Sequence, residues 1–499
     1  MRVAPARDFT PARSTTTMRA SLSRAIARAV LRAPSRASPS RRRPGASRAF
    51  ARDADDASRV AVLGGGAAGL TAAYFAARAG ARVTVYERTS ECGKKILMSG
   101  GARCNVLPTS ATANDFTTES ANRRLKAVLA SWSVERCREW LETEIGLGLG
   151  IEIASNKYFP LSNSSREVRD RLVAACEKAG VEFKYETSVD GVVRGSDGMG
   201  WTLRVRGSGD ERARAIVLAM GGLSFPAVGT DGTGYAIARR DLGHALHEPY
   251  PALVPLTGPH PGGEPLPGVS VEVELKVAAA NADGGGGKKK AQAIRKGFLF
   301  THRGYSGPSV LDLSHHLVRP LVRANESKGG SLRDEDFDAP TSSSPRMVIN
   351  WSGIKREEWQ ERLTAPPGRA LVVSRLREAL PSRLADALVA ESGVDSRCKI
   401  AELKKDDRAK LLRVLTEYEI AVKGHQGYRK AEVTGGGVAL DELDTTSMES
   451  LKAPGVYMCG EVCDVFGRIG GFNFLWAWCS GRLAGMSAAK AVTRTSDVN

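Results

Sequence analysis

The stretch from Arg59 to Arg88, RVAVLGGGAAGLTAAYFAARAGARVTVYER, constrains the fold of this chain more than any other. An apolar run ends in the glycine-rich residues 64–69, an alanine-rich helical segment follows to Arg78, and a second apolar run ends at Glu87. This order of strand, turn, helix and strand is typical of a dinucleotide-binding unit. The alternative, a glycine-rich turn with no ligand, leaves the helix and the terminal acid unexplained.

Each glycine of this motif has a physical role. Gly64 permits the tight turn, Gly66 lets the backbone approach a pyrophosphate, and Gly69 lets the helix pack close to the strand. Ala67 and Ala68 open the helix, whose N-terminal dipole favours the phosphates.

The acid at the end of the motif completes it. Glu87 is placed to hydrogen-bond a ribose hydroxyl, and Arg88 beside it belongs to the same predicted site.

The charge of the chain is concentrated at its start. The net charge is +17, but residues 1–52 hold 13 Arg against one acid, Asp8, which leaves +5 for the remainder. Arg24, Arg28 and Arg32 recur at four-residue spacing in a segment rich in Ser and Ala. Such a leader is typical of an organellar transit peptide, with a mitochondrion favoured over a chloroplast. A disordered basic tail is the alternative, and the mildly basic body is compatible with an RNA substrate.

Three further classes of protein are disfavoured. No run of 18 apolar residues occurs, so no membrane span is expected. The eight cysteines include no C-x-x-C pair, which disfavours a dithiol oxidoreductase. Cys459 and Cys463 lack partners at zinc-site spacing, so no metal is expected.

A second glycine-rich loop follows Cys92-Gly93-Lys94-Lys95. In a flavoprotein the chain would cross the isoalloxazine face here, because only small residues let the backbone lie near a flat ring. The predicted cofactor-binding residues of this segment are Lys95, Ser99, Gly100, Gly101, Arg103, Cys104 and Asn105.

The next residues alternate between helical and strand patterns. We predict a helix over residues 121–143, a helix from about Ser165 to Lys178, and strands at Val181 to Tyr185, 201–206 and 214–219. The last strand runs into Gly221, predicted to return the chain to the cofactor; a plain turn is the alternative.

The region from about Pro249 to Gly424 changes character. β-like segments come first, at Val269 to Val277 and Gly297 to Thr301, and a helical pattern follows from Ala370 to Tyr418. Two polar interruptions, Asp283 to Lys290 and Glu326 to Pro345, are predicted surface loops. We interpret this region as an insertion.

The C-terminal segment resumes the cofactor pattern. A short apolar strand ends in Gly460-Glu461, which in flavin enzymes contacts the ribityl chain and phosphate. Gly470-Gly471-Phe472-Asn473 then opens a helix whose N-terminus would stabilise negative charge at the flavin pyrimidine edge. Either glycine cluster alone could be an ordinary turn.

Together these stretches resemble the BaiN/YhiN-like flavoproteins, NAD(P)/FAD-dependent oxidoreductases, over nearly all of residues 59–490. The most specific stretches are KKILMSGGARCN, FLFTHRGYSGPSVLDLS, VTGGGV and PGVYMCGEVCDVFGRIGGFNFLWAWCSGRLAG. The resemblance implies an α/β fold: a glutathione-reductase-type, FAD-binding Rossmann domain interrupted by a β-rich and a helical subdomain. The predicted boundaries are 1–52 for the leader, 58–247 and 426–492 for the two parts of the FAD-binding domain, 248–355 for the β-rich insertion and 356–425 for the helical one.

Two departures from the family pattern concern substrate rather than FAD. Ala102 replaces a glycine of the family loop, and Phe474-Leu475 replace Leu-Gln in the terminal helix, so an amide near the flavin is lost. These departures leave the expectation of FAD binding intact, and they make the substrate of the bacterial members a weaker guide to the substrate of this chain.

The resemblance implies reduction of an activated C=C bond by hydride transfer from flavin N5, with a side-chain acid protonating the neighbouring carbon. Cys104 is one candidate acid, and a buried space-filling thiol is its alternative. His302 and Tyr305 form a second candidate pair in a predicted substrate lid, with a solvated Gly-Pro turn as the alternative. Lys94, Lys95 and Arg103 could hold a phosphate or RNA backbone, polarise the flavin O2, or be solvated.

Three functions remain open from the sequence. The first is an organellar FAD reductase, with uridine in ribosomal RNA as the leading substrate and dihydrouridine as the product. The second is an enone or lipid reductase or dehydrogenase, and the third is a flavin-bound RNA or ribosome-associated protein without turnover. Because only one dinucleotide fingerprint is present, the reductant is NAD(P)H bound transiently or another protein.

Overall fold

The computed structural model describes residues 59–196, 198–263, 265–278, 292–327, 345–364 and 370–493. The predicted leader, residues 1–52, lies outside the described residues. So do the predicted loop Asp283 to Lys290 and all but the ends of Glu326 to Pro345.

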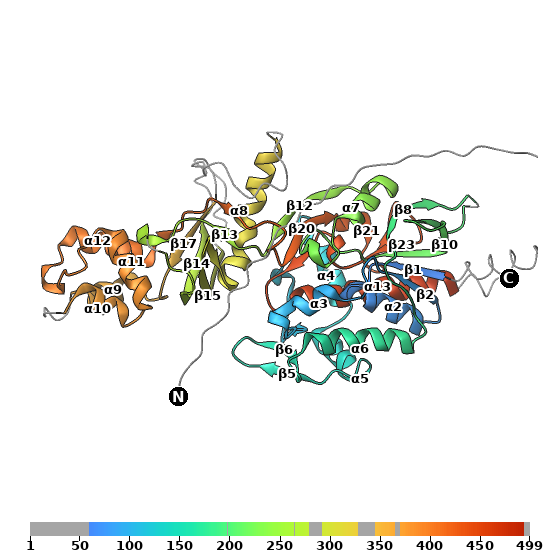
Figure 1. Ribbon diagram of the computed structural model, residues 1–499, viewed down its shortest axis with the longest axis horizontal. Coiled ribbons are helices and arrows are strands. Elements are labelled where there is room, and N and C mark those ends of the chain that lie inside the picture. Colours follow the sequence, from blue (N-terminus) through green and yellow to red (C-terminus); the bar gives the residue numbers. More distant parts are fainter. Residues whose placement is uncertain are drawn as a thin grey trace, which may run out of the picture. The chain divides into compact units, whose positions relative to one another are not determined.

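The first apolar run of the chain forms an inner strand of a largely parallel sheet (Figure 1). Strand β1 (Arg59–Leu63) pairs in parallel with β2 (Arg82–Tyr86) on one side and with β11 (Ala215–Leu218) on the other. Strand β23 (Val456–Met458) pairs in parallel with β11, so the C-terminal segment completes the sheet. From edge to edge the order is β21 (Leu443–Asp444), β22 (Glu449–Ser450), β23, β11, β1, β2 and β7 (Glu182–Lys184).

The first helix and the last helix of this body pack directly on each other. They are α2 (Ala67–Arg78) and α13 (Phe472–Thr493). A Cβ atom added at Gly481 would lie 2.6 Å from the Ala68 carbonyl oxygen, and one at Gly485 would lie 2.2 Å from that of Ala72. Glycine is therefore required at both positions for the helices to approach this closely.

One predicted helix is divided in the structure. In place of a single helix over residues 121–143 there are two, α4 (Asn122–Ala130) and α5 (Val134–Thr143). Ser133 lies between them with extended backbone, and its hydroxyl accepts a hydrogen bond from the Arg136 amide at 3.3 Å. This N-cap begins a new helix, and the prediction of one continuous helix was wrong.

The other elements of this body complete its layers and rim. The remaining helices are α3 (Lys94–Met98), α6 (Ser165–Lys178) and α7 (Thr233–Ala236). The remaining strands are β3 (Leu107–Pro108), β4 (Phe116–Thr117), β5 (Leu149–Glu152), β6 (Lys157–Pro160), β8 (Val189–Arg194), β9 (Trp201–Val205), β10 (Glu211–Ala213) and β24 (Phe466–Gly467).

The inserted region forms a second, mostly antiparallel sheet and a group of helices. Its strands, in spatial order, are β18 (Tyr418–Glu419), β17 (Arg346–Asn350), β14 (Ser270–Ala278), β15 (Gln292–Thr301), β16 (Gly304–Ser306), β13 (Leu256–Thr257) and β19 (Gly424–His425). Its helices are α8 (Pro308–Ser327), α9 (Arg356–Arg362), α10 (Val372–Arg377), α11 (Ser382–Ser392) and α12 (Lys405–Thr416). The predicted order of strands followed by helices holds only in part. Helix α8 precedes β17, and β18 and β19 return to the sheet after α12, because the end of the helical segment pairs with β17 and β13.

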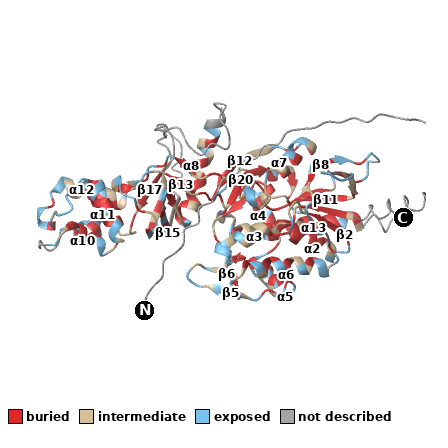
Figure 2. Cartoon of the chain, viewed as in Figure 1, coloured by how far each residue is buried: buried red, intermediate tan, exposed pale blue. Residues whose placement is uncertain are grey.

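The insertion leaves and rejoins the first body through one antiparallel pair, β12 (Leu246–Ala252) and β20 (Val433–Val438). On either side of this pair lies a separate buried core, the first around the parallel sheet and α13, the second around β14, β15 and α11 (Figure 2). The predicted fold class, a Rossmann-type FAD-binding fold with a β-rich and a helical insertion, is confirmed. The cofactor site is formed at the loops that follow the parallel strands.

Candidate functional site

A cavity of about 380 Å³ lies at the carboxyl ends of the parallel strands, where ligands bind in open α/β sheets. It is lined by the loop after β1, the end of β2, α3 and the loop after it, the turn after β11, Gly460-Glu461 and the start of α13. Of the predicted cofactor-binding residues, those that line it are Gly64, Gly66, Ala67, Ala68, Glu87, Arg88, Lys95, Ser99, Gly100, Gly101, Asn105, Gly221, Gly460, Glu461, Gly470, Gly471 and Asn473.

The three motif glycines have the predicted geometry. Gly64 has φ +102°, and an added Cβ would lie 2.5 Å from the Ala219 carbonyl oxygen. A Cβ at Gly69 would lie 1.9 Å from the Gly64 carbonyl oxygen, so this glycine sets the distance between helix and strand. At Gly66 an added Cβ meets no atom within 4 Å, because this position faces the cavity.

The start of α2 is built to receive an anion. Gly66 is its N-cap, no side chain caps it, and its first turn contains no acid. The first amide groups and the positive end of the helix dipole are therefore directed at the cavity beside Ala67 and Ala68. This arrangement fits the pyrophosphate of a dinucleotide.

Glu87 holds the glycine loop from the end of β2. Its Oε2 accepts a hydrogen bond from the Gly65 amide at 3.0 Å, and its Oε1 accepts two from Thr89, from the amide and the hydroxyl, each at 2.8 Å. Oε2 can accept one further hydrogen bond, whereas Oε1 already accepts two, and the ribose contact stays a prediction. Arg88 forms an ion pair with Asp231 at the same end of the cavity.

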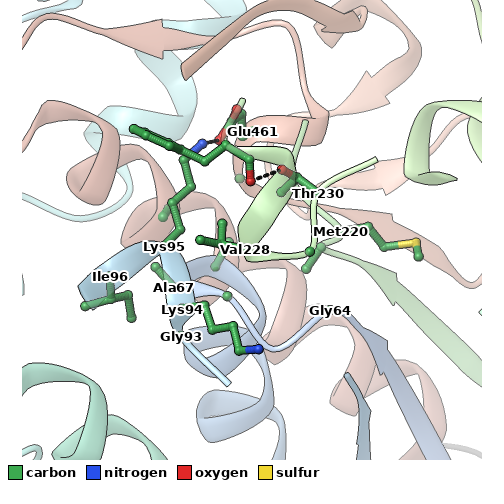
Figure 3. Close-up of a pocket in the computed structure, with 18 of the residues that line it drawn as sticks. Gly64, Ala67, Gly93, Lys94, Lys95, Ile96, Met220, Val228, Thr230 and Glu461 are labelled. Atoms are coloured by element: carbon green, nitrogen blue, oxygen red, sulfur yellow. Dashed lines mark hydrogen bonds and ion pairs between the residues drawn. The ribbon is translucent and has the colours of Figure 1, made fainter. Parts of the chain in front are cut away.

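A second polar network joins three distant segments of the chain. The Lys95 ammonium donates to Glu461 Oε2 at 2.6 Å (Figure 3). It also donates to the Ser224 hydroxyl. Glu461 Oε1 accepts from the Ser224 hydroxyl and from the Thr434 amide, each at 2.9 Å. An added Cβ at Gly222 would lie 2.4 Å from the Thr434 hydroxyl oxygen, so this glycine lets the turn after β11 reach the network.

We expect Glu461→Gln to destabilise the protein by about 1.5–3 kcal/mol, since a charged acceptor of several buried donors is lost. Denaturant unfolding measures this, and Glu402→Gln, in an exposed pair with Lys399, should unfold like the wild type. The double variant Glu461→Gln, Lys95→Met should lose clearly less stability than the sum of the losses in the two single variants. Additive losses would show that Lys95 and Glu461 act separately.

The start of α13 closes another side of the cavity. Asn473 accepts a hydrogen bond from the Gly467 amide at 2.8 Å and donates one to the Gly467 carbonyl at 2.9 Å, which fixes the loop before the helix. Phe472 is buried beside Phe116, with ring centroids 5.9 Å apart, and does not line the cavity. Gly471 does line it, at the helix N-terminus.

The catalytic candidates from the sequence are not brought to the cavity. Cys104 is fully buried, outside the cavity lining, and burial raises the pKa of its thiol to about 12. Tyr305 lies in the core of the insertion, where its hydroxyl donates to the Pro259 carbonyl and burial raises its pKa. His302 is exposed in the preceding turn.

Two further predicted site residues also lie outside the cavity lining. Arg103 stacks over Phe159, 4.3 Å from the ring centroid, and pairs with Glu152 at 2.9 Å. Gly69 acts through packing, as described above.

Sequence reasoning missed the cavity residues contributed by the insertion and its return strand. These are Leu253, Leu311, Glu432 and Val433. The residues Thr187 to Asp190, Phe225 and Val228 to Asp231 were missed as well, and no local motif marks either segment. The VTGGGV stretch did carry a signal, since it contains Val433 and the Thr434 of the Glu461 network.

The fold and this cavity define a flavoprotein: the glycine loop, the two helix N-termini and the absence of side chain at Gly66 fit FAD lying across the ends of the parallel strands. The match to known proteins is specific. The chain belongs to the HI0933-like protein family, whose Rossmann domain matches residues 58–487. It is an FAD-dependent oxidoreductase.

Three curated relatives cover nearly the whole of this chain and of themselves. The ribosomal RNA dihydrouridine synthase of Escherichia coli is 32% identical over 84% of this chain and 95% of its own length. The enzyme of the same name from Haemophilus influenzae is 28% identical over 86% and 98%. The 3-dehydro-bile acid delta(4,6)-reductase of Clostridium scindens is 29% identical over 87% and 99%.

None of the helices among the described residues has the length and apolar character needed to cross a membrane. No three His, Cys, Asp or Glu side chains in the described part of the chain cluster in a way that could hold a metal ion.

Proposed function

We propose that this protein reduces the uracil ring of uridine in ribosomal RNA to dihydrouridine. The observation that carries this is that one cavity is lined both by the dinucleotide loop and by Leu253 and Leu311 of the insertion. A reacting ring placed against these apolar side chains would share the cavity with the flavin and be shielded from water. The similarity to two ribosomal RNA dihydrouridine synthases supports RNA as the substrate.

The chemistry divides between the cofactor and the chain. Bound FAD would supply hydride, with NAD(P)H as the transient reductant. The chain positions the rings through its glycine turns and excludes water with Leu253, Leu311 and Val433. Lys94 lines the cavity and forms no ion pair within the described residues, so its ammonium is available to a phosphate group.

The arginine-rich segment of residues 1–52 supports an organellar site of action. Under this proposal the RNA is that of the organelle's own ribosome, with the mitochondrion favoured over the chloroplast.

A second candidate is the reduction of a small conjugated enone. The apolar lining residues Leu253, Leu311 and Val433 favour it, as does the similarity to a bile acid reductase. The two substrates differ in charge, which gives a direct way to separate them.

We expect the FAD-loaded full-length chain, incubated with NADPH and an unmodified ribosomal RNA transcript, to form dihydrouridine detectable by nucleoside mass spectrometry. Added salt should slow this reaction steeply, since binding of an RNA backbone releases counterions, and should leave turnover of an uncharged enone nearly unchanged. Omission of NADPH is the control. Enone turnover without dihydrouridine would favour the second candidate, and flavin that no substrate reoxidises anaerobically would contradict both.

A further inference from the structure

Six carboxylates line the cavity, and five of them are held by partners. Glu87 and Glu461 are described above. The others are Glu91 with Arg169 at 2.5 Å, Asp190 with Arg206 at 2.7 Å, and Asp231 with Arg88 and Thr233. The sixth, Glu432, accepts no hydrogen bond and forms no ion pair within the described residues.

Glu432 lies on the side of the cavity formed by the insertion. It directly precedes β20, and its amide donates to the Leu253 carbonyl at 3.1 Å, which ties it to the end of β12. The apolar residues Leu253, Leu311 and Val433 also line the cavity. Glu432 thus lines the cavity from the insertion side, close to the Lys95–Glu461 pair but outside its hydrogen bonds.

This environment favours the protonated carboxyl. Burial raises the pKa of Glu432 above its usual value, although the charge of Lys95 acts in the opposite direction. Lys95 does not neutralise Glu432 by contact, because its ammonium is paired with Glu461. A carboxyl that keeps its proton closer to neutral pH is suited to general acid catalysis.

We propose that Glu432 is the general acid of this site, donating a proton to the substrate carbon next to the one that accepts hydride. This inference rests on the proposed reduction of a C=C bond. The O–H bond of Glu432 breaks, and its proton forms a C–H bond with the electron pair of the substrate's π bond. Hydride comes from the reduced cofactor, with NAD(P)H oxidised in the overall reaction, and the Glu432 carboxylate regains a proton from water.

The first test compares Glu432→Gln with the wild type in the two half-reactions, flavin reduction by NADPH and substrate reduction by the reduced flavin. We expect substrate reduction to slow by about 100- to 10,000-fold, the usual contribution of a general acid. FAD affinity, the flavin absorbance spectrum and the rate of flavin reduction by NADPH should stay unchanged. Glu432→Asp, which keeps the acid, should recover part of the rate.

The matched control is Glu419→Gln, the same substitution at a different position. Glu419 lies on β18 of the insertion and forms an exposed ion pair with Arg346. It should reduce substrate at the wild-type rate. Product formation by Glu432→Gln within about threefold of the wild type would overturn the role of Glu432, since general acids contribute far more. Absence of product from the wild-type protein on RNA and enone alike would contradict the proposed function instead.

A second test needs no turnover and follows thermal unfolding of the FAD-loaded protein against pH. The raised pKa means that the folded state binds this proton more tightly than the unfolded state. In the wild type, the stabilisation that protonated Glu432 contributes is therefore fully present below the pKa that Glu432 has in the unfolded chain. It is lost as pH rises through the pKa that Glu432 has in the folded protein. The Tm of Glu432→Gln minus the Tm of the wild type should thus increase as pH rises from acidic to neutral and alkaline values. A Tm difference that does not vary with pH would contradict a proton held at this position.

Discussion

Gly66→Asp is expected to fold normally and to lose FAD. An added side chain at this position meets no protein atom, and its backbone is extended, with φ −78°, so neither a clash nor strain opposes the substitution. The new carboxylate would lie at the start of α2, where the cofactor's pyrophosphate is expected. Like charges brought together out of water cost several kcal/mol, so FAD affinity should fall by at least about 100-fold.

The measurements are the FAD content of the purified protein and the Kd for added FAD. Gly209→Asp is the matched control: this glycine is exposed, an added Cβ meets nothing, and it lies outside the cavity lining. It should bind FAD like the wild type. A Gly66→Asp protein that stays yellow would place the pyrophosphate elsewhere.

Gly485→Val is expected to have the largest effect on stability. A Cβ at this position would lie 2.2 Å from the Ala72 carbonyl oxygen, and backbone of a packed helix cannot move aside as a flexible side chain can. Overpacking of this kind costs about 3 kcal/mol or more, and α13 would have to separate from α2. Thermal unfolding should show a lowered Tm, and FAD content should fall with it because both helix N-termini line the cavity.

Met486→Val controls for the β-branched side chain. It changes the next residue of the same helix, where the side chain is 42% exposed, and should leave the Tm nearly unchanged. A Gly485→Val protein as stable as this control would mean that the two helices can separate without loss.

The parts of the site that local sequence predicts are those contained in one short segment. Gly64, Gly66 and Gly69 act within a single strand, turn and helix, so their spacing alone specifies the turn, the open position and the close packing. Glu87 is at the end of the same unit, and its bond to the Gly65 amide closes it.

The parts that local sequence could not predict depend on contacts between distant segments. Glu461 meets Lys95 across 366 positions of sequence and Ser224 across 237, and no periodicity encodes such pairs. Glu432 becomes a cavity residue only because β20 pairs with β12. Tyr305 shows the converse: its motif is polar, but its strand β16 pairs with β15 and directs the ring into the core.

The packing of α13 on α2 also orders events during synthesis of the chain. The glycine loop is synthesised long before β23 and α13, which flank β11 and α2. Until then the small-residue surface of α2 and one edge of β11 are uncovered, and the cavity lacks the wall formed by Gly460 to Ala477. We therefore expect FAD to bind only once β23 and α13 have been made. Between the synthesis of β11 and that of β23 the nascent chain exposes an unpaired strand edge, and chaperone binding in that period would protect it.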